Sequence, residues 1–352
     1  MDTTPQRLAD NGTAANNTTT ANNGTRDGAA RPRILVIKLG ALGDVVQATG
    51  PFAAIRAHHP DAHITLLTTP PWAGLLALSG WFDAIDTGGR PRKYSPREWR
   101  RLLGFLARNR FDRVYDLQTA DRSTLCFWLM ALLHPLHVPQ WNGIARLGSH
   151  RHTNPARDAM HTIERQAEQL AVAGIGAVPP PSLDFVREGM AKGPEDFGLA
   201  RPYALLAAGG APHRPDKRWP LGHWTRLARA LAERGVQPVL TGTKAEAQAN
   251  ATIAAFCPAA RDLTGDTSLA DLVRLARGAA IAIGNDTGPM HLAAVAGAPC
   301  VVLYSSASDP ALCAQRGPRV TILRRERLDE LGVEEVMGVV EGILTGSLAH
   351  RD

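Results

Sequence analysis

The feature that most constrains this chain is the alternation of short buried strands with helices, which begins with a strand, a glycine-bearing turn and an apolar helix. The first unit has an apolar run at residues 34–37, the turn KLGALGD at 38–44 and a helix-like stretch at 45–57. Further predicted elements alternate along the chain at 63–67, 96–108 and 111–117. Because strand and helix alternate, the pattern predicts a parallel α/β sheet.

A second α/β series begins at residue 203. Its predicted strands lie at 203–208, 238–240, 280–283 and 300–304, and its predicted helices at 219–234, 269–277, 290–296 and 328–344. A Pro- and Gly-rich stretch at 178–198 separates the two series and is typical of a linker. We therefore predict two Rossmann-like domains facing each other across a cleft, with ligands at the carboxyl ends of the strands.

The domain boundaries follow from these shifts in composition. Residues 1–30 are rich in Asn and Thr and carry almost no large apolar side chains, so they are predicted to be disordered. The chain of 352 residues also suits two domains better than one. The predicted division is a tail at 1–30, an N-terminal acceptor-binding domain at 31–180, a linker at 181–200, a nucleotide-sugar-binding domain at 201–327, and a final helix and tail at 328–352.

Composition excludes several classes of protein. The formal net charge of +6 weakly favours an anionic partner, but no dense Lys/Arg block suggests nucleic acid. The most apolar run, at 125–133, is half the roughly 18 residues that a membrane span needs, and predicts a buried helix. No C-x-x-C pair occurs among the four cysteines, so buried free thiols in a reducing cytosol are expected rather than zinc or disulfides.

The turn after the first strand is the first candidate site. Gly40 and Gly43 let the backbone pass close to a ligand. Asp44, at the start of the next helix, is either an ordinary helix cap or a general base at the floor of the cleft. The turn lacks G-x-G-x-x-G, and no acid follows the second strand, so an NAD-dependent dehydrogenase is disfavoured.

The string GNDTGPMH at 284–291 is the strongest local signal. It lies between a predicted strand and a predicted helix, where Asp286 or Thr287 can cap the helix. With Gly288 next to them, the free N–H groups and the helix dipole form an anion site, and His291 lies one turn inside. The alternative is a well-made helix start and nothing more. The string is richer than capping requires, so it favours a site.

Two further strand ends in the second domain carry candidate donor contacts. Gly209 permits a close approach of a ligand, and Lys217 offers a charge to a phosphate, although the loop around it could be merely solvated. Thr243 and Glu246 are placed to meet a ribose or base, or simply to cap a helix. Residues 263–265 are a candidate for the base pocket.

In the first domain, Gln118 follows a predicted strand and Arg122 comes four residues later. A basic cluster surrounds the next candidate, Arg92, and is either a contact for an anionic acceptor or the polar face of a helix. The cluster comprises Arg90, Arg92, Lys93, Arg97, Arg100 and Arg101. No His, Cys or acidic spacing indicates a metal site.

Together these strings resemble glycosyltransferase family 9, the heptosyltransferases of lipopolysaccharide core assembly. Lys38 and the Gly43–Asp44 turn are similar to the family's opening, and KRWP at 217–220 is similar to its K-x-W-P segment. DTGPMHLAA at 286–294 resembles its D-[ST]-G-x-x-H-L-A-A motif. The similarity extends over residues 33 to about 345.

The resemblance implies a GT-B fold whose last helix crosses back to the first domain. It implies inverting, metal-independent transfer from ADP-heptose to a lipopolysaccharide core sugar, with no cofactor besides the sugar nucleotide. Asp44 would be the general base. The implied donor contacts are Lys217, Gly209, Thr243, Glu246, Asp286, Thr287, Gly288 and His291; the implied acceptor contacts are Lys38, Gly43, Gln118, Arg122 and Arg92.

Two departures from the family pattern keep alternatives open. Residues 304–310 read YSSASDP where the family has a G-P-T-D-P-like segment, and no Ser or Thr precedes Gly43. The same fold using a GDP- or UDP-sugar, and a non-catalytic nucleotide-sugar-binding module, are therefore the alternatives. A cytoplasmic protein, with peripheral contact to the inner membrane through the basic cluster, is expected in the transferase case.

Overall fold

The computed structural model describes residues 31–210 and 214–348. The predicted disordered tail at 1–30 lies outside the described residues. No helix within the described ranges combines the length and the apolar character that a membrane span requires.

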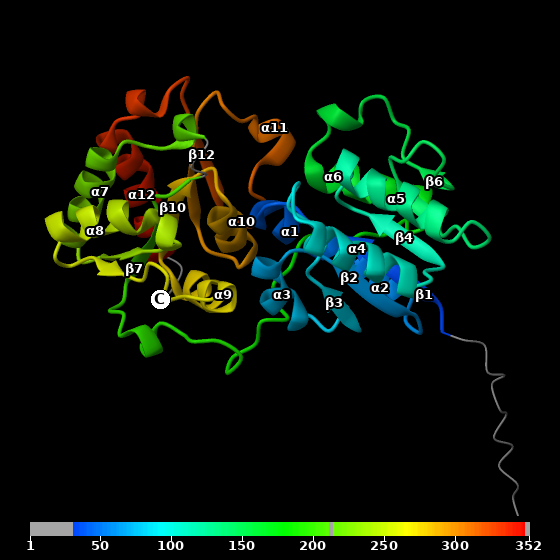
Figure 1. Ribbon diagram of the computed structural model, residues 1–352. Helices are drawn as coiled ribbons and strands as arrows, with labels where there is room; N and C mark the ends of the chain where they lie inside the picture. Colours follow the sequence, from blue (N-terminus) through cyan, green and yellow to red (C-terminus); the bar gives the residue numbers. More distant parts are fainter. Residues whose placement is uncertain (1–30, 211–213, 349–352) are drawn as a thin grey trace, which may run out of the picture. The chain divides into compact units, whose positions relative to one another are not determined.

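The first sheet is built from six parallel strands in the order β3-β2-β1-β4-β5-β6 (Figure 1). The strands are β1 (Arg33–Ile37), β2 (His63–Leu67), β3 (Ala84–Asp86), β4 (Arg113–Asp116), β5 (Gln140–Gly143) and β6 (His150–Arg151). The order reverses between β1 and β4, which is the point where Rossmann-type sheets bind ligands.

The second sheet repeats this order as β12-β11-β10-β7-β8-β9, also with parallel strands. Its strands are β7 (Tyr203–Ala207), β8 (Gln237–Leu240), β9 (Arg261–Asp262), β10 (Ile281–Asn285), β11 (Cys300–Tyr304) and β12 (Val320–Arg324). The strand order of this second sheet reverses between β7 and β10. The prediction of two Rossmann-like α/β sheets is confirmed.

Both faces of the first sheet are buried, which explains its continuous apolar strands. Ile34 and Val36 of β1 pack toward one face, and Leu35 and Ile37 pack toward the other. One face is covered by α1 (Leu42–Gln47), α2 (Thr49–His58) and α6 (Thr162–Val172), and the other by α4 (Pro96–Arg108) and α5 (Asp121–Leu133). The remaining helix, α3 (Pro70–Ala77), follows β2.

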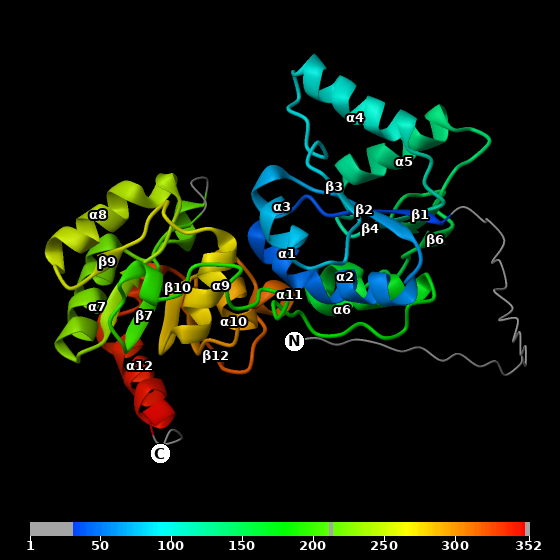
Figure 2. The same cartoon turned by 90° about the horizontal axis from the view of Figure 1, so that it is seen from below.

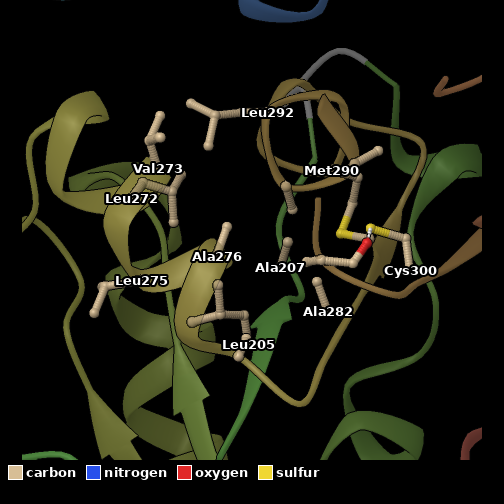
Figure 3. Close-up of a cluster of buried hydrophobic side chains, with 14 of the residues drawn as sticks. Leu205, Ala207, Leu272, Val273, Leu275, Ala276, Ala282, Met290, Leu292 and Cys300 are labelled. Atoms are coloured by element: carbon tan, nitrogen blue, oxygen red, sulfur yellow. Dashed lines mark hydrogen bonds between the residues drawn. The ribbon is translucent and has the colours of Figure 1, made fainter. Parts of the chain in front are cut away.

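The second sheet alternates in the same way. Leu205 and Ala207 of β7 face α9 (Leu269–Gly278) and α10 (Gly288–Val295). Met290 of α10 and Cys300 of β11 belong to the same buried cluster, which Figure 3 shows. Its other face is covered by α7 (Leu221–Glu233), α8 (Ala247–Phe256) and α12 (Val333–Leu348). A short helix, α11 (Pro310–Cys313), joins β11 to β12.

The structure corrects the predicted helix at 45–57. It is two helices that meet at Ala48, and the first begins at Leu42. Pro51 has no N–H to donate to the Gln47 carbonyl, so one unbroken helix cannot pass this point. Because the helix begins early, Asp44 lies within its first turn.

The prediction that the last helix crosses back to the first domain is wrong for the described part of the chain. The buried side chains Val336, Met337 and Val340 of α12 pack in one cluster with Trp224 and Leu227 of α7. Figures 1 and 2 both show α12 beside α7. The helix α12 remains on the second sheet because its apolar side chains cover the part of the sheet face that α7 and α8 do not cover.

The apolar run at 125–133 forms α5, but the prediction of a buried helix is only half right. Cys126, Phe127 and Met130 are buried against the first sheet. Trp128 and Leu132, on the opposite side of the helix, are exposed.

Candidate functional site

The starts of α1 and α10 pack against each other, and two glycines make this contact possible. A Cβ on Gly43 would lie 2.6 Å from Cδ2 of His291, and a Cβ on Gly288 would lie 2.6 Å from Cβ of Leu42. Each helix follows the strand at the reversal point of its own sheet, β1 or β10. The ligand-binding edges of the two sheets therefore meet here. Gly43, predicted to contact an acceptor, lies against His291 and is not among the residues that line the polar cavity described next.

A polar cavity of about 230 Å³ lies at the reversal point of the first sheet. It brings together the predicted residues Lys38, Asp44 and Gln118. The rest of its lining is Leu117, Thr119, Arg157, Asp158, Arg165, Gln166 and Gln169. Three cationic and two acidic side chains line it, a balance that favours a polar ligand with negative charge.

Lys38 is held at the floor of this polar cavity. The side chain is 4% exposed, and Nζ donates a hydrogen bond of 3.1 Å to the Leu117 carbonyl. Burial lowers the pKa of Lys38, while the Asp44 carboxylate nearby raises it in part. The burial and the hydrogen bond fix the position of the Lys38 amine in the lining that it shares with Asp44.

Asp116 at the end of β4 shapes the wall that carries Gln118. Its Oδ1 accepts hydrogen bonds from the backbone N–H groups of Gln118 and Thr119, at 3.1 and 3.0 Å. Burial raises the pKa of Asp116 to about 6, despite these bonds. Thr119 has φ of 47°, a left-handed conformation that costs a β-branched residue free energy. Such strain is common where a loop is fixed for a ligand.

The sequence analysis missed two basic side chains of the polar cavity, Arg157 and Arg165. Arg165 lies on α6 and Arg157 just before it, far along the chain from the strand ends that carry Lys38, Asp44 and Gln118. The burial of Arg165 lowers its pKa, and Asp158 and Asp44 oppose that effect. Only the helical spacing on α6 could have indicated that this residue turns toward the first sheet.

A second cavity, of about 370 Å³, adjoins the second sheet and suits a nucleotide in size. It brings together five of the predicted donor contacts: Gly209, Thr243, Glu246, Thr287 and Gly288. The rest of its lining is Leu42, Trp72, Ala207, Gly210, Thr241, Gly242, Ala245, Thr267, Ser268, Leu269, Leu272 and Pro289. We refer to this site as the nucleotide-sized cavity.

Glu246 both caps a helical turn and lines the nucleotide-sized cavity. Its Oε2 accepts hydrogen bonds from the backbone N–H and the hydroxyl of Thr243, at 2.8 and 2.7 Å. A Cβ on Gly209 would lie 2.4 Å from Cγ of Glu246, so this close approach requires glycine. The sequence left open whether Glu246 caps a helix or contacts a ligand. In the structure Glu246 caps a helical turn and also lines the cavity. The other oxygen, Oε1, forms no hydrogen bond within the described ranges.

Two lining features of the nucleotide-sized cavity differ from the sequence analysis. Trp72 of α3 comes from the first domain, where its Nε1 donates a hydrogen bond of 2.9 Å to the Gly40 carbonyl. The candidate base-pocket residues 263–265 are not among the lining residues, which come from 267–272 instead. The Thr264 hydroxyl is occupied by Asp262, to which it donates at 2.6 Å.

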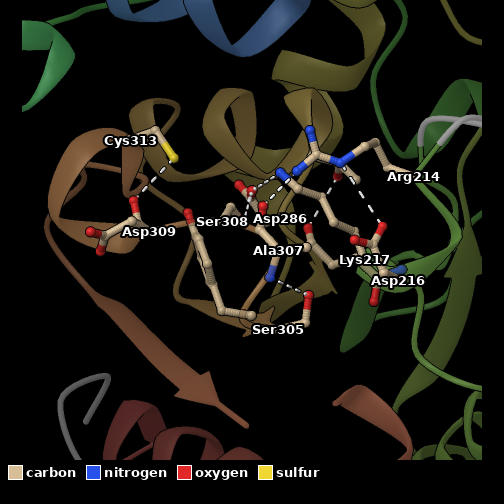
Figure 4. A network of polar contacts seen from close by, with 12 residues as sticks. Arg214, Asp216, Lys217, Asp286, Ser305, Ala307, Ser308, Asp309 and Cys313 are labelled. Carbon is tan, nitrogen blue, oxygen red and sulfur yellow. Dashed lines mark hydrogen bonds and ion pairs between the residues drawn. The ribbon is translucent and has the colours of Figure 1, made fainter. Parts of the chain in front are cut away.

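Asp286 is the centre of a polar network beside this cavity (Figure 4). Its carboxylate accepts hydrogen bonds from Lys217 Nζ at 2.7 Å, Ser308 Oγ at 2.7 Å and Gln315 Nε2 at 3.0 Å. Burial would raise the pKa of Asp286, but the bonds from Lys217 and Ser308 outweigh it and lower the pKa. The carboxylate is therefore ionised at neutral pH.

The sequence left open which residue caps α10 and what the unusual stretch at 304–310 does, and the structure answers both questions. The residue at the cap of α10 is Thr287, and its side chain makes no capping bond to the first N–H groups of the helix. Ser308 lies in the stretch at 304–310 that departs from the family pattern, and it is one of the groups that hold Asp286.

His291 links the network to α1 without lining either cavity. Its Nε2 lies 4.0 Å from Oδ1 of Asp286, and its ring packs against Gly43. Burial lowers the pKa of His291 to about 4, so the ring is neutral at pH 7. A neutral, buried ring at this contact is a spacer between the two helix starts.

Two predicted acceptor residues are not brought to the site. Arg92 is mostly exposed and forms an ion pair of 2.6 Å with Glu98. Arg122 is exposed near the start of α5. Neither lines the polar cavity, so the geometry gives no support to the prediction that they contact the acceptor. Within residues 31–210 and 214–348, no three His, Cys, Asp or Glu side chains are grouped as metal ligands.

Comparison with known proteins gives the family. The family model of glycosyltransferase family 9 (heptosyltransferase) matches residues 99–336, more than half of the chain. Lipopolysaccharide heptosyltransferase 2 of Salmonella typhimurium is 29% identical over 302 residues, 78% of this chain and 83% of that protein. The enzyme of the same name from Escherichia coli is 27% identical over 305 residues, with the same coverage.

Solved structures show the same fold. The structure of E. coli ADP-heptose lipopolysaccharide heptosyltransferase II aligns with a TM-score of 0.72 at 24% identity, over 90% of this chain and 99% of that one. A family 9 glycosyltransferase from Veillonella parvula aligns with a TM-score of 0.74 at 20% identity, over 90% and 97%. The two parallel sheets described above are thus the GT-B architecture, and the chain is a glycosyltransferase that belongs to family 9, the heptosyltransferases.

Proposed function

We propose that this glycosyltransferase transfers a heptose from ADP-heptose to a sugar of a lipopolysaccharide core, with inversion at the anomeric carbon and without a metal ion. The observation that carries the proposal is the position of α1 between two cavities. Leu42 lines the nucleotide-sized cavity, and Asp44, two residues further on, lines the polar cavity. A donor and an acceptor held in these cavities would meet at the start of one helix.

Asp44 acts as the general base in this proposal. Its carboxylate takes the proton of the acceptor hydroxyl while the hydroxyl oxygen attacks the anomeric carbon of the donor. The new C–O bond forms on the face opposite the bond to the diphosphate, which breaks, so one displacement inverts the configuration. Lys38 lines the same cavity as Asp44, and its Nζ is fixed there by the hydrogen bond to the Leu117 carbonyl.

The leaving diphosphate gains negative charge as its bond to the sugar breaks. Lys217 is the cation assigned to offset it, together with the N–H groups at the start of α10. Without ligand, Lys217 is paired with Asp286 at 2.7 Å. Donor binding would therefore reorient Lys217 or place the phosphate beside an existing ion pair. In the proposal, the charge of Lys217 takes the place of a divalent metal ion at the diphosphate.

The adenine nucleotide and the heptose are proposed from the relatives. Solved heptosyltransferases of E. coli contain ADP and ADP-2-deoxy-2-fluoro heptose, and align with TM-scores of 0.69 and 0.68. The proposed acceptor is an anionic core sugar, which suits the cationic balance of the polar cavity. Because such an acceptor is anchored in lipid, we place the enzyme in the cytoplasm with peripheral contact to the inner membrane.

The test combines donor binding and turnover in the presence of EDTA. Calorimetric titration compares ADP, GDP and UDP, and mass spectrometry follows the core acceptor with ADP-heptose. We expect selective ADP binding and a product heavier by one heptose. Asp44→Asn should keep ADP binding and lower kcat by roughly 10²–10⁴-fold, the usual contribution of a general base. Asp121→Asn, at an exposed carboxylate outside both cavities, is the matched control.

Each contrary outcome identifies an alternative. Preference for GDP or UDP would keep the transferase and discard ADP-heptose. Nucleotide binding without turnover, unchanged by Asp44→Asn, would indicate a binding module. Full activity of Asp44→Asn would remove Asp44 as the base, and loss of activity with EDTA would contradict transfer without a metal.

A further inference from the structure

The outer face of α5 exposes large apolar side chains in a helical row. Leu125, Trp128 and Leu132 are 39%, 44% and 78% exposed, and their spacing of three and four residues puts them on one side of the helix. Cys126 and Phe127 face the sheet on the other side. A helix that is apolar on both sides usually has a partner on each.

The apolar surface continues beyond the end of α5. Leu136 is fully exposed, and Val138 after it is 47% exposed. Together with Leu125, Trp128 and Leu132 they form what we call the α5 apolar surface. Isolated exposed leucines are ordinary, but several large apolar side chains exposed on one side of a helix and in the segment after it favour an interaction site.

Basic side chains lie on the neighbouring helix. Figure 2 shows α4 beside α5, and His134 Nε2 contacts the Leu106 carbonyl at 3.0 Å to tie the two together. Arg97, Arg100 and Arg108 of α4 are exposed. In the described part of the chain Arg97 and Arg100 form no ion pair, so their charges are available to a partner. The predicted basic cluster thus lies partly on the helix that neighbours α5, and none of its members lines the polar cavity.

We infer that the α5 apolar surface and the α4 arginines form a docking surface for a bilayer that contains anionic lipid. Apolar side chains beside arginines match the boundary between acyl chains and anionic headgroups. Basic residues near such a membrane are attracted to its negative surface. A symmetric dimer through this surface would bring the arginines of both copies close together, which like-charge repulsion disfavours.

This inference rests on the proposed function in one respect: a lipid-anchored acceptor gives the enzyme a reason to dock. It goes beyond that proposal because it names the docking residues. None of them lines the polar cavity or the nucleotide-sized cavity. Changes at the docking surface should therefore affect membrane binding and leave the reaction with a free acceptor unchanged.

The experiment is co-sedimentation of the full chain with unilamellar vesicles, made of phosphatidylcholine alone or mixed with phosphatidylglycerol. The apolar variant is Trp128→Glu with Leu132→Glu, and its matched control is Phe256→Glu, at an exposed side chain of α8. The basic variant is Arg97→Glu with Arg100→Glu, and its control is Arg229→Glu, at an exposed position of α7. Circular dichroism and ADP titration check that every variant is folded.

We expect the unmodified chain to bind the mixed vesicles, to bind phosphatidylcholine weakly, and to release the mixed vesicles as salt is added. Each double variant should lower vesicle affinity by about tenfold or more. The apolar variant puts two carboxylates where apolar side chains would meet the acyl chains, and the basic variant replaces attraction to anionic headgroups by repulsion at two positions. The two controls should bind like the unmodified chain.

Three results would overturn the inference. The first is that the unmodified chain does not bind the mixed vesicles. The second is that Phe256→Glu loses as much vesicle affinity as the apolar variant does. The third is a dimer in analytical ultracentrifugation that the apolar variant converts to monomer. Vesicle binding needs neither donor nor turnover, so failure of the proposed reaction would leave this test intact. Conversely, turnover of a delipidated acceptor would persist if only the docking surface were wrong.

Discussion

At the residue scale, His291 shows how a buried group makes stability depend on pH. Burial lowers its pKa from the ordinary 6.5 to about 4, so between these values the unfolded chain binds a proton that the folded chain does not. The free energy of unfolding should therefore fall as pH decreases from 6.5 to 4. The full effect is about 3 kcal/mol, at 1.36 kcal/mol per pKa unit.

Urea denaturation of the unmodified chain and His291→Gln across this pH range measures the effect. The variant, which cannot titrate, should lose that part of the slope and be the flatter of the two. His59, whose pKa burial also lowers to about 4, supplies a similar slope to both proteins and cancels in the comparison. Parallel slopes would mean that His291 is protonated in the folded chain.

At the element scale, the contact between α1 and α10 depends on the absence of two Cβ atoms. Gly43→Ala would place a methyl group 2.6 Å from the His291 ring, which is closer than van der Waals contact allows. We expect a loss of stability of about 1–3 kcal/mol, as for other overpacking, and a fall in kcat because α1 carries Asp44. Thermal denaturation and the transfer assay measure the two effects.

Gly338→Ala is the matched control for this contact. Gly338 lies inside α12, where an added Cβ meets nothing within 4 Å. In a helix interior, alanine stabilises by about 0.5–1 kcal/mol relative to glycine. The two substitutions should therefore have opposite signs. Equal effects would show that the contact at Gly43 is not under steric constraint.

The elements also show what a single sequence can predict. The strands at 34–37 and 300–304 were found because a strand buried on both faces is a continuous apolar run, a local signal. The residues Asp44, Gln118 and Thr287 were found because ligands collect where such strands end. Arg165 and Trp72 were missed because they reach the cavities from α6 and α3 through tertiary packing, which leaves no mark at a strand end.

The prediction for α12, which is wrong, and the prediction for α5, which is half right, have the same cause. The sequence shows that α5 and α12 are apolar, but it does not show what covers them. The apolar stripe of α12 is used by the second sheet, so the helix does not cross to the first domain. Only one side of α5 is used by the first sheet, so the other side stays exposed. The periodicity of a sequence shows that a helix has an apolar side, but tertiary packing decides which element covers that side.

At the scale of the whole molecule, the nucleotide-sized cavity couples the two sheets. Most of its lining comes from the second domain, but Leu42 and Trp72 come from the first. A ligand that touches both should stabilise both, by RT ln(1 + [L]/Kd), or about 2.7 kcal/mol at 100 times the dissociation constant. Hydrogen exchange with ADP should then slow at α10 and also at α1 and α3.

Trp72→Ala separates this coupling from simple binding. The indole lines the cavity and donates a hydrogen bond of 2.9 Å to the Gly40 carbonyl, so it would connect a bound nucleotide to the turn that precedes Asp44. In the variant, ADP should still protect α10 but no longer α3, and saturation with ADP should raise Tm less than in the unmodified chain. Protection of α10 alone in both proteins would mean that the nucleotide is held by the second domain without the first. In that case Asp44 would reach the donor only after a further movement of the two domains, because the cavity itself would not hold them together.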